Sequence, residues 1–356
     1  MGSVQAVWSL PTPAFGSAVS TVDTAWPADW SCPRFQGNPS AAQGRWSQQA
    51  FPVPPEWRYN GPHGDVHHRR EGPDCRRAMD KHAMRRIGLL HHPKIPQSLS
   101  LAKEAGELLS GLGRTVWHSS SWDEEGVLKS AHESDLLVTF GGDGTIVRVA
   151  RTTAGHDLPI LGVNLGRLGF LAEVQPRELS SKLGLVANGE YWIEQRMMLA
   201  ARLVRDEHMI ESFEAVNDVV MSRGRIARVV RVNSHVDGEF LTQYVSDGVI
   251  VATPTGSTAY ALAAGGPILD PRLSVMLLKP VAPHLTAASA LVVPGEARVR
   301  LELSTEYEAS LSIDGQIHLP VHDGDVVEVT GSEHVCRFLR LGNHAEFYRT
   351  LLERLR

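Results

Sequence analysis

Cysteine is scarce in this sequence, and its scarcity excludes several classes of protein. The 356 residues include three cysteines, Cys32, Cys75 and Cys336, which lie far apart and form no CxxC pair. This spacing argues against a disulfide framework or a thiolate metal site and favours a reducing compartment, so we expect a cytoplasmic location. The sequence also lacks an apolar run of the roughly 18–20 residues that a membrane span needs.

An excess of positive charge is missing as well. No Lys or Arg precedes Arg34, so the basic start of a secretory signal is absent. The formal net charge is −5, so nothing global attracts nucleic acid or an anionic membrane surface, and we expect neither as a partner. Any phosphate ligand must then be held by local backbone amides, arginines or a metal ion. The hydrophobic content of 42% is sufficient for two packed cores.

Residues 1–80 lack the apolar periodicity that predicts helices or strands, and scatter Pro, Gly and Trp instead. We expect either an irregular N-terminal extension or a start assigned too far upstream, with Met79 or Met84 as the true first residue. The histidines of "HGDVHH" fall in this segment without the usual spacing of zinc ligands, so solvated surface is the favoured interpretation.

An α/β region is predicted over residues 85–183, completed by residues 340–356. Short apolar runs in "RRIGLLHHP", "RTVWH", "DLLVTF" and "PILGVN" predict buried strands, and "SLSLAKEAGELLSGLG" has helical spacing that stops at Gly113. Strands that alternate with helices indicate a Rossmann-like parallel sheet. The apolar spacing of "HAEFYRTLLERLR" predicts a final helix that returns to this region.

Residues 184–339 have a different pattern of apolar and polar residues, which is typical of an all-β sandwich. Alternating apolar and polar residues predict strands, and the pairs Asp237-Gly238 and Asp314-Gly315 are typical of tight hairpin turns. The sequence therefore predicts an α/β domain followed by an antiparallel β-sandwich domain, with no internal repeat.

The segment "FGGDGT" is the first candidate site. It joins a predicted strand to a helix that we expect Thr145 to cap, and Gly141, Gly142 and Gly144 can present backbone N–H groups to a diphosphate. A simple tight turn is the alternative. Asp143 adds negative charge to this loop, which is useful if Mg²⁺ offsets that charge or if the carboxylate takes a proton from a hydroxyl nucleophile. No GK[ST] follows and no GxGxxG opens a strand, which disfavours the usual NTPases and dehydrogenases.

Two further segments carry polar groups in unusual density. In "TPTGSTAYALAAGG", several hydroxyls share one loop before a small-residue helix; a Ser/Thr-rich capping turn is the alternative. Asn217 and Asp218 lie just inside a predicted strand, where an adjacent amide and carboxylate can hold both hydroxyls of a ribose, or form a bulge. Asp247 orients a polar ligand group or caps a turn. The arginines that follow are typical of a solvated face, with a phosphate contact from Arg228 as the minority interpretation.

These three segments, in this order, resemble the signature motifs of the NAD kinases. "LGRLGFLAEV" and "SIDGQ" are similar to shorter motifs of the same family, and the resemblance covers about residue 85 to the C-terminus. The sequence departs from the family pattern at Ser289-Ala290, where an Arg-Pro pair is usual, and at Asp270, where histidine is frequent. The "GGDGT" loop alone also resembles diacylglycerol and sphingosine kinases.

The resemblance implies transfer of a phosphoryl group from ATP or polyphosphate to the 2′-hydroxyl of the adenosine ribose of NAD, giving NADP, with Mg²⁺ or another divalent cation as cofactor. It makes Asp143 the base that accepts the hydroxyl proton, while Gly141, Gly142 and Gly144 line the diphosphate. Asn217 and Asp218 would then hold ribose hydroxyls. The other substrate-binding residues that it implies are Thr145, Arg148, Phe170, Arg228, Val245, Asp247, Thr255, Ser257, Thr258, Ala259, Tyr260, Ala261, Leu262, Ala263 and Gln316.

Within that set, the resemblance implies particular roles. Thr258, Ala259 and Tyr260 would contact an adenine, Phe170 would pack beside it, and Arg148 would contact phosphate. Asp247 would reach the nicotinamide-side amide, with Val245 and Gln316 lining the same pocket. NAD and ATP are the expected small-molecule partners, and a homodimer or homotetramer is the expected assembly. A lipid kinase of the same superfamily and a non-catalytic NAD sensor are the alternatives; a carboxylate in a phosphate loop argues against the sensor.

Overall fold

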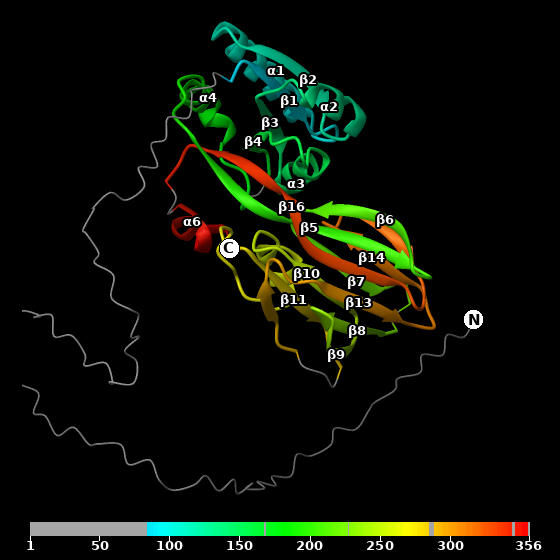
Figure 1. The fold of residues 1–356 in the computed structure, drawn as a ribbon. Coiled ribbons are helices and arrows are strands. Elements are labelled where there is room, and N and C mark those ends of the chain that lie inside the picture. Colours follow the sequence, from blue (N-terminus) through cyan, green and yellow to red (C-terminus); the bar gives the residue numbers. More distant parts are fainter. Residues whose placement is uncertain (1–83, 167–168, 227, 285–287, 344–345, 355–356) are drawn as a thin grey trace, which may run out of the picture. The chain divides into compact units, whose positions relative to one another are not determined.

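The computed structural model describes residues 84–166, 169–226, 228–284, 288–343 and 346–354, all within the compact unit Pro73–Arg356 (Figure 1). The irregular segment predicted over residues 1–80, with Met79 and the "HGDVHH" histidines, lies outside these ranges. No helix in the described part of the chain combines the length and apolar character that a membrane crossing requires.

Four parallel strands form the predicted α/β sheet, in the order β2-β1-β3-β4. They are β1 (Arg86–His91), β2 (Thr115–Ser120), β3 (Leu136–Gly141) and β4 (Pro159–Asn164). Every residue of β3 is buried, because helices cover both faces of the sheet. The strands predicted from the four apolar runs are confirmed.

Two helices cover each face of this sheet. The helices are α1 (Pro96–Gly111), α2 (Glu124–Ala131), α3 (Asp143–Thr152) and α4 (Leu179–Ala187), the last preceded by the 3₁₀ turn η2 (Pro176–Glu178). Apolar side chains of α1 and α4 pack with Leu89 and Val138 on one face, whereas those of α2 and α3 pack with Leu90 and Leu137 on the other. Gly113 follows α1 with φ of 74°, which confirms the predicted stop signal.

Two sheets contain the remaining strands, and the parallel strands belong to the larger one. This ten-stranded sheet continues from β4 through β16, β13, β8 and β9, and β5 pairs with both β16 and β6. Its antiparallel members are β5 (Trp192–Arg205), β6 (His208–Ala215), β8 (Val230–Val236), β9 (Glu239–Ser246), β13 (Val299–Ser304) and β16 (Val326–Arg340). The six-stranded sheet has the order β12-β11-β10-β7-β14-β15. Its strands are β7 (Asp218–Arg223), β10 (Gly248–Ala252), β11 (Val275–Val281), β12 (Leu291–Pro294), β14 (Ala309–Ile313) and β15 (Ile317–Val321).

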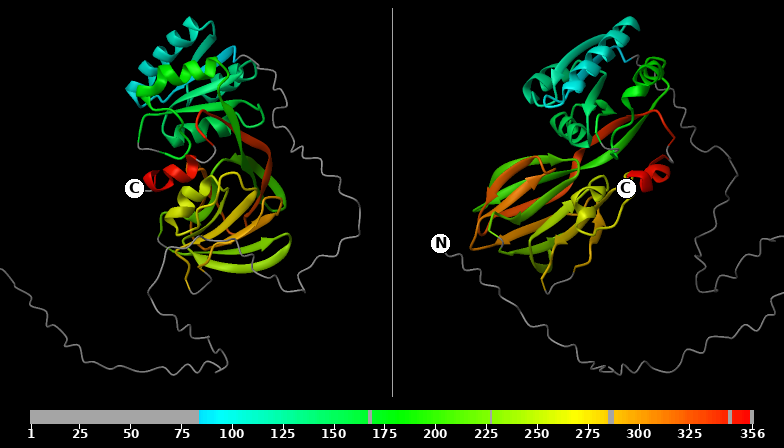
Figure 2. Two further views of the ribbon diagram at one scale, coloured as in Figure 1. Left: turned by 90° about the vertical axis from the view of Figure 1, so that its left-hand side faces the viewer. Right: turned by 180° about the vertical axis from the view of Figure 1, so that it is seen from behind.

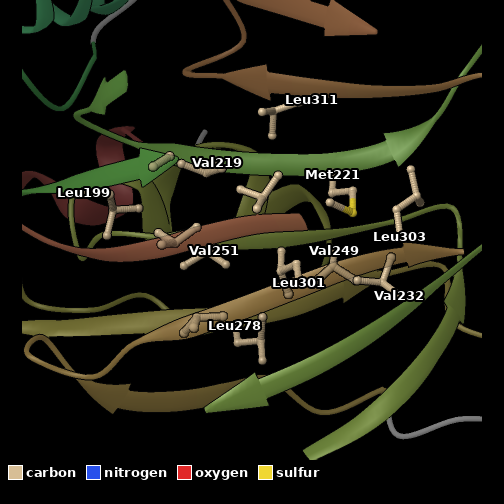
Figure 3. Close-up of a cluster of buried hydrophobic side chains, with 14 of the residues drawn as sticks. Leu199, Val219, Met221, Val232, Val249, Val251, Leu278, Leu301, Leu303 and Leu311 are labelled. Atoms are coloured by element: carbon tan, nitrogen blue, oxygen red, sulfur yellow. The ribbon is translucent and has the colours of Figure 1, made fainter. Parts of the chain in front are cut away.

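The antiparallel strands of the two sheets pack face to face around an apolar core, which confirms the predicted sandwich. Figure 3 shows Val219, Met221 and Val251 of the six-stranded sheet near Leu301 and Leu303 of the other, and all five belong to one buried cluster. Alternate residues of each strand point into this core, as the period of two in the sequence requires.

Both predicted hairpin turns are present. Asp237-Gly238 joins β8 to β9 with φ of 52° and 88°, and Asp314-Gly315 joins β14 to β15 with φ of 53° and 64°. Two consecutive positive φ angles define the type I′ turn, which favours Asp-Gly because few other residues adopt this conformation. The second turn carries side chains of the candidate site.

β16 and helix α6 (Glu346–Arg354) return the chain to the α/β region, as predicted. The C-terminal end of β16 pairs in parallel with β4, where Phe338 lies opposite Ile160. The ring of Phe347 on α6 lies 6.4 Å from that of Phe170, and the Tyr348 hydroxyl donates to Asp270, so α6 also contacts the segment after α5. Both views of Figure 2 draw the red helix α6 beside the yellow part of the chain that contains α5. The domain limits at 183–184 and 339–340 stay predictions; α4 and β16 span them.

Candidate functional site

The glycine loop connects β3 to α3. Gly142 is the N-cap of α3, because its carbonyl accepts the N–H groups of Thr145 at 2.9 Å and Ile146 at 3.3 Å. The prediction that Thr145 caps this helix is therefore wrong: the helix begins earlier, at Asp143, and Thr145 lies buried in its first turn. A Cβ on Gly141 would lie 2.2 Å from Thr145 Oγ1, so glycine is needed there for packing.

The other two loop glycines face open space. A Cβ at Gly142 would meet no atom within 4 Å, and one at Gly144 would meet only Gln316 Nε2, at 3.9 Å. Packing therefore does not explain these glycines, whereas room for a ligand beside the backbone does. The start of α3 adds unpaired N–H groups and a partial positive charge, which suit phosphate.

Asp143 links the glycine loop to the segment that follows β4. Its Oδ2 accepts the backbone N–H of Phe170 at 2.6 Å, and its Oδ1 accepts that of Leu171 at 3.2 Å. A Cβ on Gly169 would lie 2.2 Å from Oδ1, so this approach requires glycine in "GFL". Each carboxylate oxygen retains lone pairs, so Asp143 can still accept a hydrogen bond from a ligand hydroxyl.

A polar chain connects the glycine loop to the second hairpin turn. Gln316 Nε2 donates to the carbonyl of Gly144 at 2.8 Å, and Arg151 Nη2 donates to Gln316 Oε1 at 3.3 Å. Arg151 Nε lies 4.0 Å from Asp314 Oδ2, and both side chains are almost fully buried. The sequence prediction missed Arg151 and Asp314; the signal for the latter is its place in "SIDGQ".

Asp314 in turn holds the Asn-Asp segment. Its Oδ1 accepts the backbone N–H groups of Val216 at 3.1 Å, Asn217 at 2.7 Å and Asp218 at 3.2 Å. Burial raises the pKa of Asp314, while the three N–H donors and Arg151 oppose that rise. The backbone before β7 is therefore fixed by the same network that reaches Gly144.

Asp218 is a buried carboxyl group, 4% exposed. Burial, followed by the charge of Asp314, raises its pKa from the usual 3.8 to about 7. Titratable groups with strongly shifted pKa values are concentrated at functional sites, because such sites keep ionisable groups buried even though burial disfavours their charged form. The side chain lines a pocket of about 380 Å³ together with Asn217, Ala259, Tyr260 and Ser312.

A second pocket, of about 320 Å³, lies at the glycine loop. It brings together Gly142, Gly144, Thr145, Arg148 and Gln316, all of which are predicted site residues. Gln316 lines this pocket beside the glycine loop, and its predicted sharing of a pocket with Val245 stays a prediction. His92, Ile95 and Trp122 complete the lining, and the sequence prediction did not include them.

The hydroxyl-rich loop has its own internal bonds. Ser257 is fully buried, donates to the carbonyl of Pro254 at 2.6 Å and accepts the N–H of Leu269 at 3.0 Å. Thr258 donates to the carbonyl of Thr255 at 3.0 Å. The small-residue helix is short: 3₁₀ turn η3 (Gly256–Thr258) and α5 (Tyr260–Ala263) replace it.

Only part of this loop faces a pocket. Ala259 and Tyr260 line the larger pocket, and the Tyr260 side chain is 45% exposed. Ala261 is buried, Leu262 is half-buried and Ala263 is exposed, and none of these three lines either pocket. Their ligand contacts, and those of Thr255, Ser257 and Thr258, stay predictions.

Four further predicted residues, which belong to other segments, also line neither of these two pockets. Asp247 accepts a hydrogen bond from Arg223 Nε at 2.9 Å, and the Val245 carbonyl accepts the N–H of His284 at 2.7 Å. Phe170 faces Phe347, as described above. The exposed Arg228 guanidinium lies 6.0 Å from the ring of Tyr307. Of these four, Phe170 reaches the glycine loop through its backbone N–H, which donates to Asp143. The predicted ligand contacts of all four stay predictions.

The donor set fits a divalent cation that arrives with phosphate. Among the residues that the structure describes, no three His, Cys, Asp or Glu side chains gather as a protein-only metal site. Mg²⁺ is typically bound through one or two carboxylates plus substrate phosphates, and Asp143 is a carboxylate within the phosphate loop. Asp143 is thus the residue that would contact such an ion.

Replacing Gln316 with leucine tests the polar chain. The substitution removes two side-chain hydrogen bonds, so we expect the free energy of unfolding to fall by about 1 kcal/mol. We also expect kcat to fall about ten-fold, because the glycine loop loses its tether to the turn that holds Asn217 and Asp218. Urea denaturation and steady-state rates are the measurements. Gln316→Glu is the matched control, since it retains the acceptor for Arg151 but loses the donor to Gly144; wild-type rates in both variants would contradict the tether.

The fold and the site together define a structural class of protein. A glycine loop leads from the carboxyl end of β3 of the parallel sheet into the N-terminus of α3, and a hairpin turn of the adjoining sandwich holds the backbone of the Asn-Asp pair through Asp314. This combination is that of a phosphate-binding α/β protein completed by a β-sandwich.

Comparison with known proteins identifies the family. The model of the ATP-NAD kinase N-terminal domain matches residues 82–191, and that of the ATP-NAD kinase C-terminal domain matches residues 216–341. The NAD kinase of Dehalococcoides mccartyi is 38% identical over 273 residues, covering 76% of this chain and 96% of the relative. That of Chloroflexus aggregans is 39% identical over 273 residues, covering 77% and 99%. The chain belongs to the NAD kinase family.

Solved structures agree with this assignment. Yeast NADH kinase complexed with NADH matches with a TM-score of 0.66 and 25% identity, covering 77% of this chain and 88% of that one. An NAD kinase from Archaeoglobus fulgidus in complex with ATP matches with a TM-score of 0.62 and 26% identity, covering 76% and 98%. The predicted two-domain fold and the predicted family are therefore confirmed.

Proposed function

We propose that this protein transfers the terminal phosphoryl group of ATP to the 2′-hydroxyl of the adenosine ribose of NAD, giving NADP and ADP. One observation carries this proposal. The polar chain from Gly144 through Gln316, Arg151 and Asp314 ties the phosphate loop to the backbone of the Asn-Asp pair. Such a tether holds a phosphoryl donor and a ribose at a fixed separation, which is the main requirement of phosphoryl transfer.

Asp143 is the proton acceptor in this proposal. The 2′-oxygen forms a bond to the terminal phosphorus of ATP, the bond from that phosphorus to the bridging oxygen breaks, and the hydroxyl proton passes to the Asp143 carboxylate. The bonds from Phe170 and Leu171 orient the carboxylate and leave lone pairs for the hydroxyl. The N–H groups at the start of α3, with Gly142 and Gly144, stabilise the phosphate charge.

The larger pocket is proposed to hold the NAD substrate. Asn217 and Asp218 would hold ribose hydroxyls, and the ring of Tyr260 would cover an adenine; their shared lining supports these roles. Arg148 in the smaller pocket would contact phosphate. The other residues implied by the family resemblance are proposed as further contacts: Phe170, Val245, Asp247, Arg228, Thr255, Ser257, Thr258, Ala261, Leu262 and Ala263.

The remaining features of the reaction are proposed from family membership and composition. A divalent cation such as Mg²⁺ would neutralise charge on the donor phosphates, with Asp143 as its protein contact. Polyphosphate is proposed as an alternative donor, a homodimer or homotetramer as the assembly, and the cytoplasm as the location. The relatives do not favour a lipid kinase or a non-catalytic sensor.

Formation of NADP from NAD, ATP and Mg²⁺ tests this function. The full chain is assayed by coupling to a dehydrogenase that accepts only NADP. We expect steady NADP formation that requires all three components. Binding of NAD without NADP formation, with ATP and with polyphosphate as donor, would refute the kinase proposal and leave the sensor in its place.

A further inference from the structure

An exposed tryptophan stands beside the glycine loop, surrounded by basic groups. Trp122, in the connection between β2 and α2, is 44% exposed. Lys94 Nζ lies 4.5 Å from its ring centroid, the Arg148 guanidinium carbon 5.3 Å, and the ring of His92 packs edge-on at 5.6 Å. By contrast, the partly buried Trp117 donates its indole N–H to Ser134. Trp122 thus keeps part of its ring exposed to solvent beside the glycine loop, while basic side chains contact the ring.

This tryptophan shares a pocket with the phosphate loop. The 320 Å³ pocket is lined by Trp122, His92 and Ile95 together with Gly142 and Gly144 of the loop. These residues follow β2, β1 and β3, three neighbouring parallel strands. The chain order of the sheet reverses between β1 and β3, and α/β sheets bind nucleotides in the crevice at the carboxyl ends of strands around such a reversal.

The charges around the pocket suit an anion. Burial, and then the positive charges of Lys94 and Arg148, lower the pKa of His92. Glu124 Oε1 lies 3.4 Å from Arg148 Nη1 and offsets part of that charge, whereas Lys94 has no carboxylate partner within the described part of the chain. A ligand that combines a flat heteroaromatic ring with several phosphates uses both features, through stacking on the indole and contacts with Lys94 and the loop amides.

We propose that Trp122 is the stacking platform for the base of the phosphoryl donor, and that it selects a nucleoside triphosphate over inorganic polyphosphate. The inference rests on the proposed kinase function and deepens it, because phosphates alone occupy the glycine loop equally well from either donor. Only a donor that carries a base gains binding free energy by stacking on the indole face. The Trp122 ring therefore determines donor preference, and the glycine loop does not.

The test compares two ligands in the full chain and in two variants. ATP and inorganic tripolyphosphate are each titrated by calorimetry in the presence of Mg²⁺, and the KM for ATP is measured beside the inhibition constant of tripolyphosphate. In Trp122→Ala, we expect Kd and KM for ATP to rise about ten-fold or more, because base stacking on an aromatic ring is lost. We expect the constants for tripolyphosphate to change less than about two-fold, because they depend on phosphate contacts alone. Trp122→Phe is the matched control, and its remaining aromatic face should keep ATP binding within about three-fold of wild type.

The outcomes separate this inference from the kinase function. An equal change for ATP and tripolyphosphate, or no change for either, would overturn the platform even if NADP is formed normally. Selective loss of ATP binding in an enzyme that forms no NADP would support the platform and refute the kinase function. Because Trp122 is exposed, both variants should fold, which unchanged thermal unfolding would verify.

Discussion

Asp143→Asn is expected to lower NADP formation by about 10²- to 10⁴-fold, the range that a positioned general base contributes. The amide has the same shape as the carboxylate and still offers one oxygen to a backbone N–H, but it does not take a proton from the 2′-hydroxyl. We expect kcat to carry the loss and KM for NAD to change little, since the substitution affects the transition state more than binding. The measurement is the initial rate of NADP formation.

The structure dictates a control for this variant. Asp143 also accepts the N–H groups of Phe170 and Leu171, so its replacement could loosen the segment that follows β4. Gly169→Ala disturbs the same contact by steric means, since the added Cβ would lie 2.2 Å from Asp143 Oδ1. If loss of loop position explains the effect, both variants should lose activity together with stability. Loss of turnover in Asp143→Asn with unchanged unfolding, beside loss of both turnover and stability in Gly169→Ala, supports proton transfer. Turnover near wild type in Asp143→Asn would contradict it.

The sequence was sufficient to predict the fold because its patterns are local. "DLLVTF" and "PILGVN" are apolar throughout, as strands buried on both faces must be, and they match β3 and β4. Helix α2 was not predicted, because it is short and contains few apolar residues. Its signal was Asp123, which accepts the N–H of Gly126 as an N-cap before two glutamates.

The candidate site could be predicted only in part, because its connections are not local. The motifs named Asp143, Asn217 and Asp218, and the structure brings the latter two into one pocket. No local pattern could show that Arg151 reaches Gln316, which lies 165 positions away, or that Asp314 holds the backbone before β7. Trp122 and His92 were missed for the same reason: each follows a different strand, and only the sheet order brings them together.

Asp218→Asn is expected to stabilise the protein at neutral pH and above. The pKa of Asp218 is 3.8 in the usual case and about 7 in the folded protein, because of burial and the neighbouring Asp314. Since the pKa of Asp218 is higher in the folded state, its contribution to the free energy of unfolding is complete below about pH 4 and is lost as pH rises toward 7. About three pH units at 1.36 kcal/mol each give a cost of at most about 4 kcal/mol at pH 8.

Urea denaturation of both proteins at pH 5, 6, 7 and 8 measures this cost. We expect wild-type stability to fall across the range relative to Asp218→Asn, with a difference of about 2–4 kcal/mol at pH 8 that shrinks toward pH 5. Asp206→Asn, at an exposed turn, is the control and should leave the pH dependence unchanged. Parallel curves for wild type and Asp218→Asn would show that Asp218 does not titrate in this window. If the curves diverge while the variant loses affinity for NAD, the buried carboxylate is kept for ligand binding at the expense of stability, as functional residues commonly are.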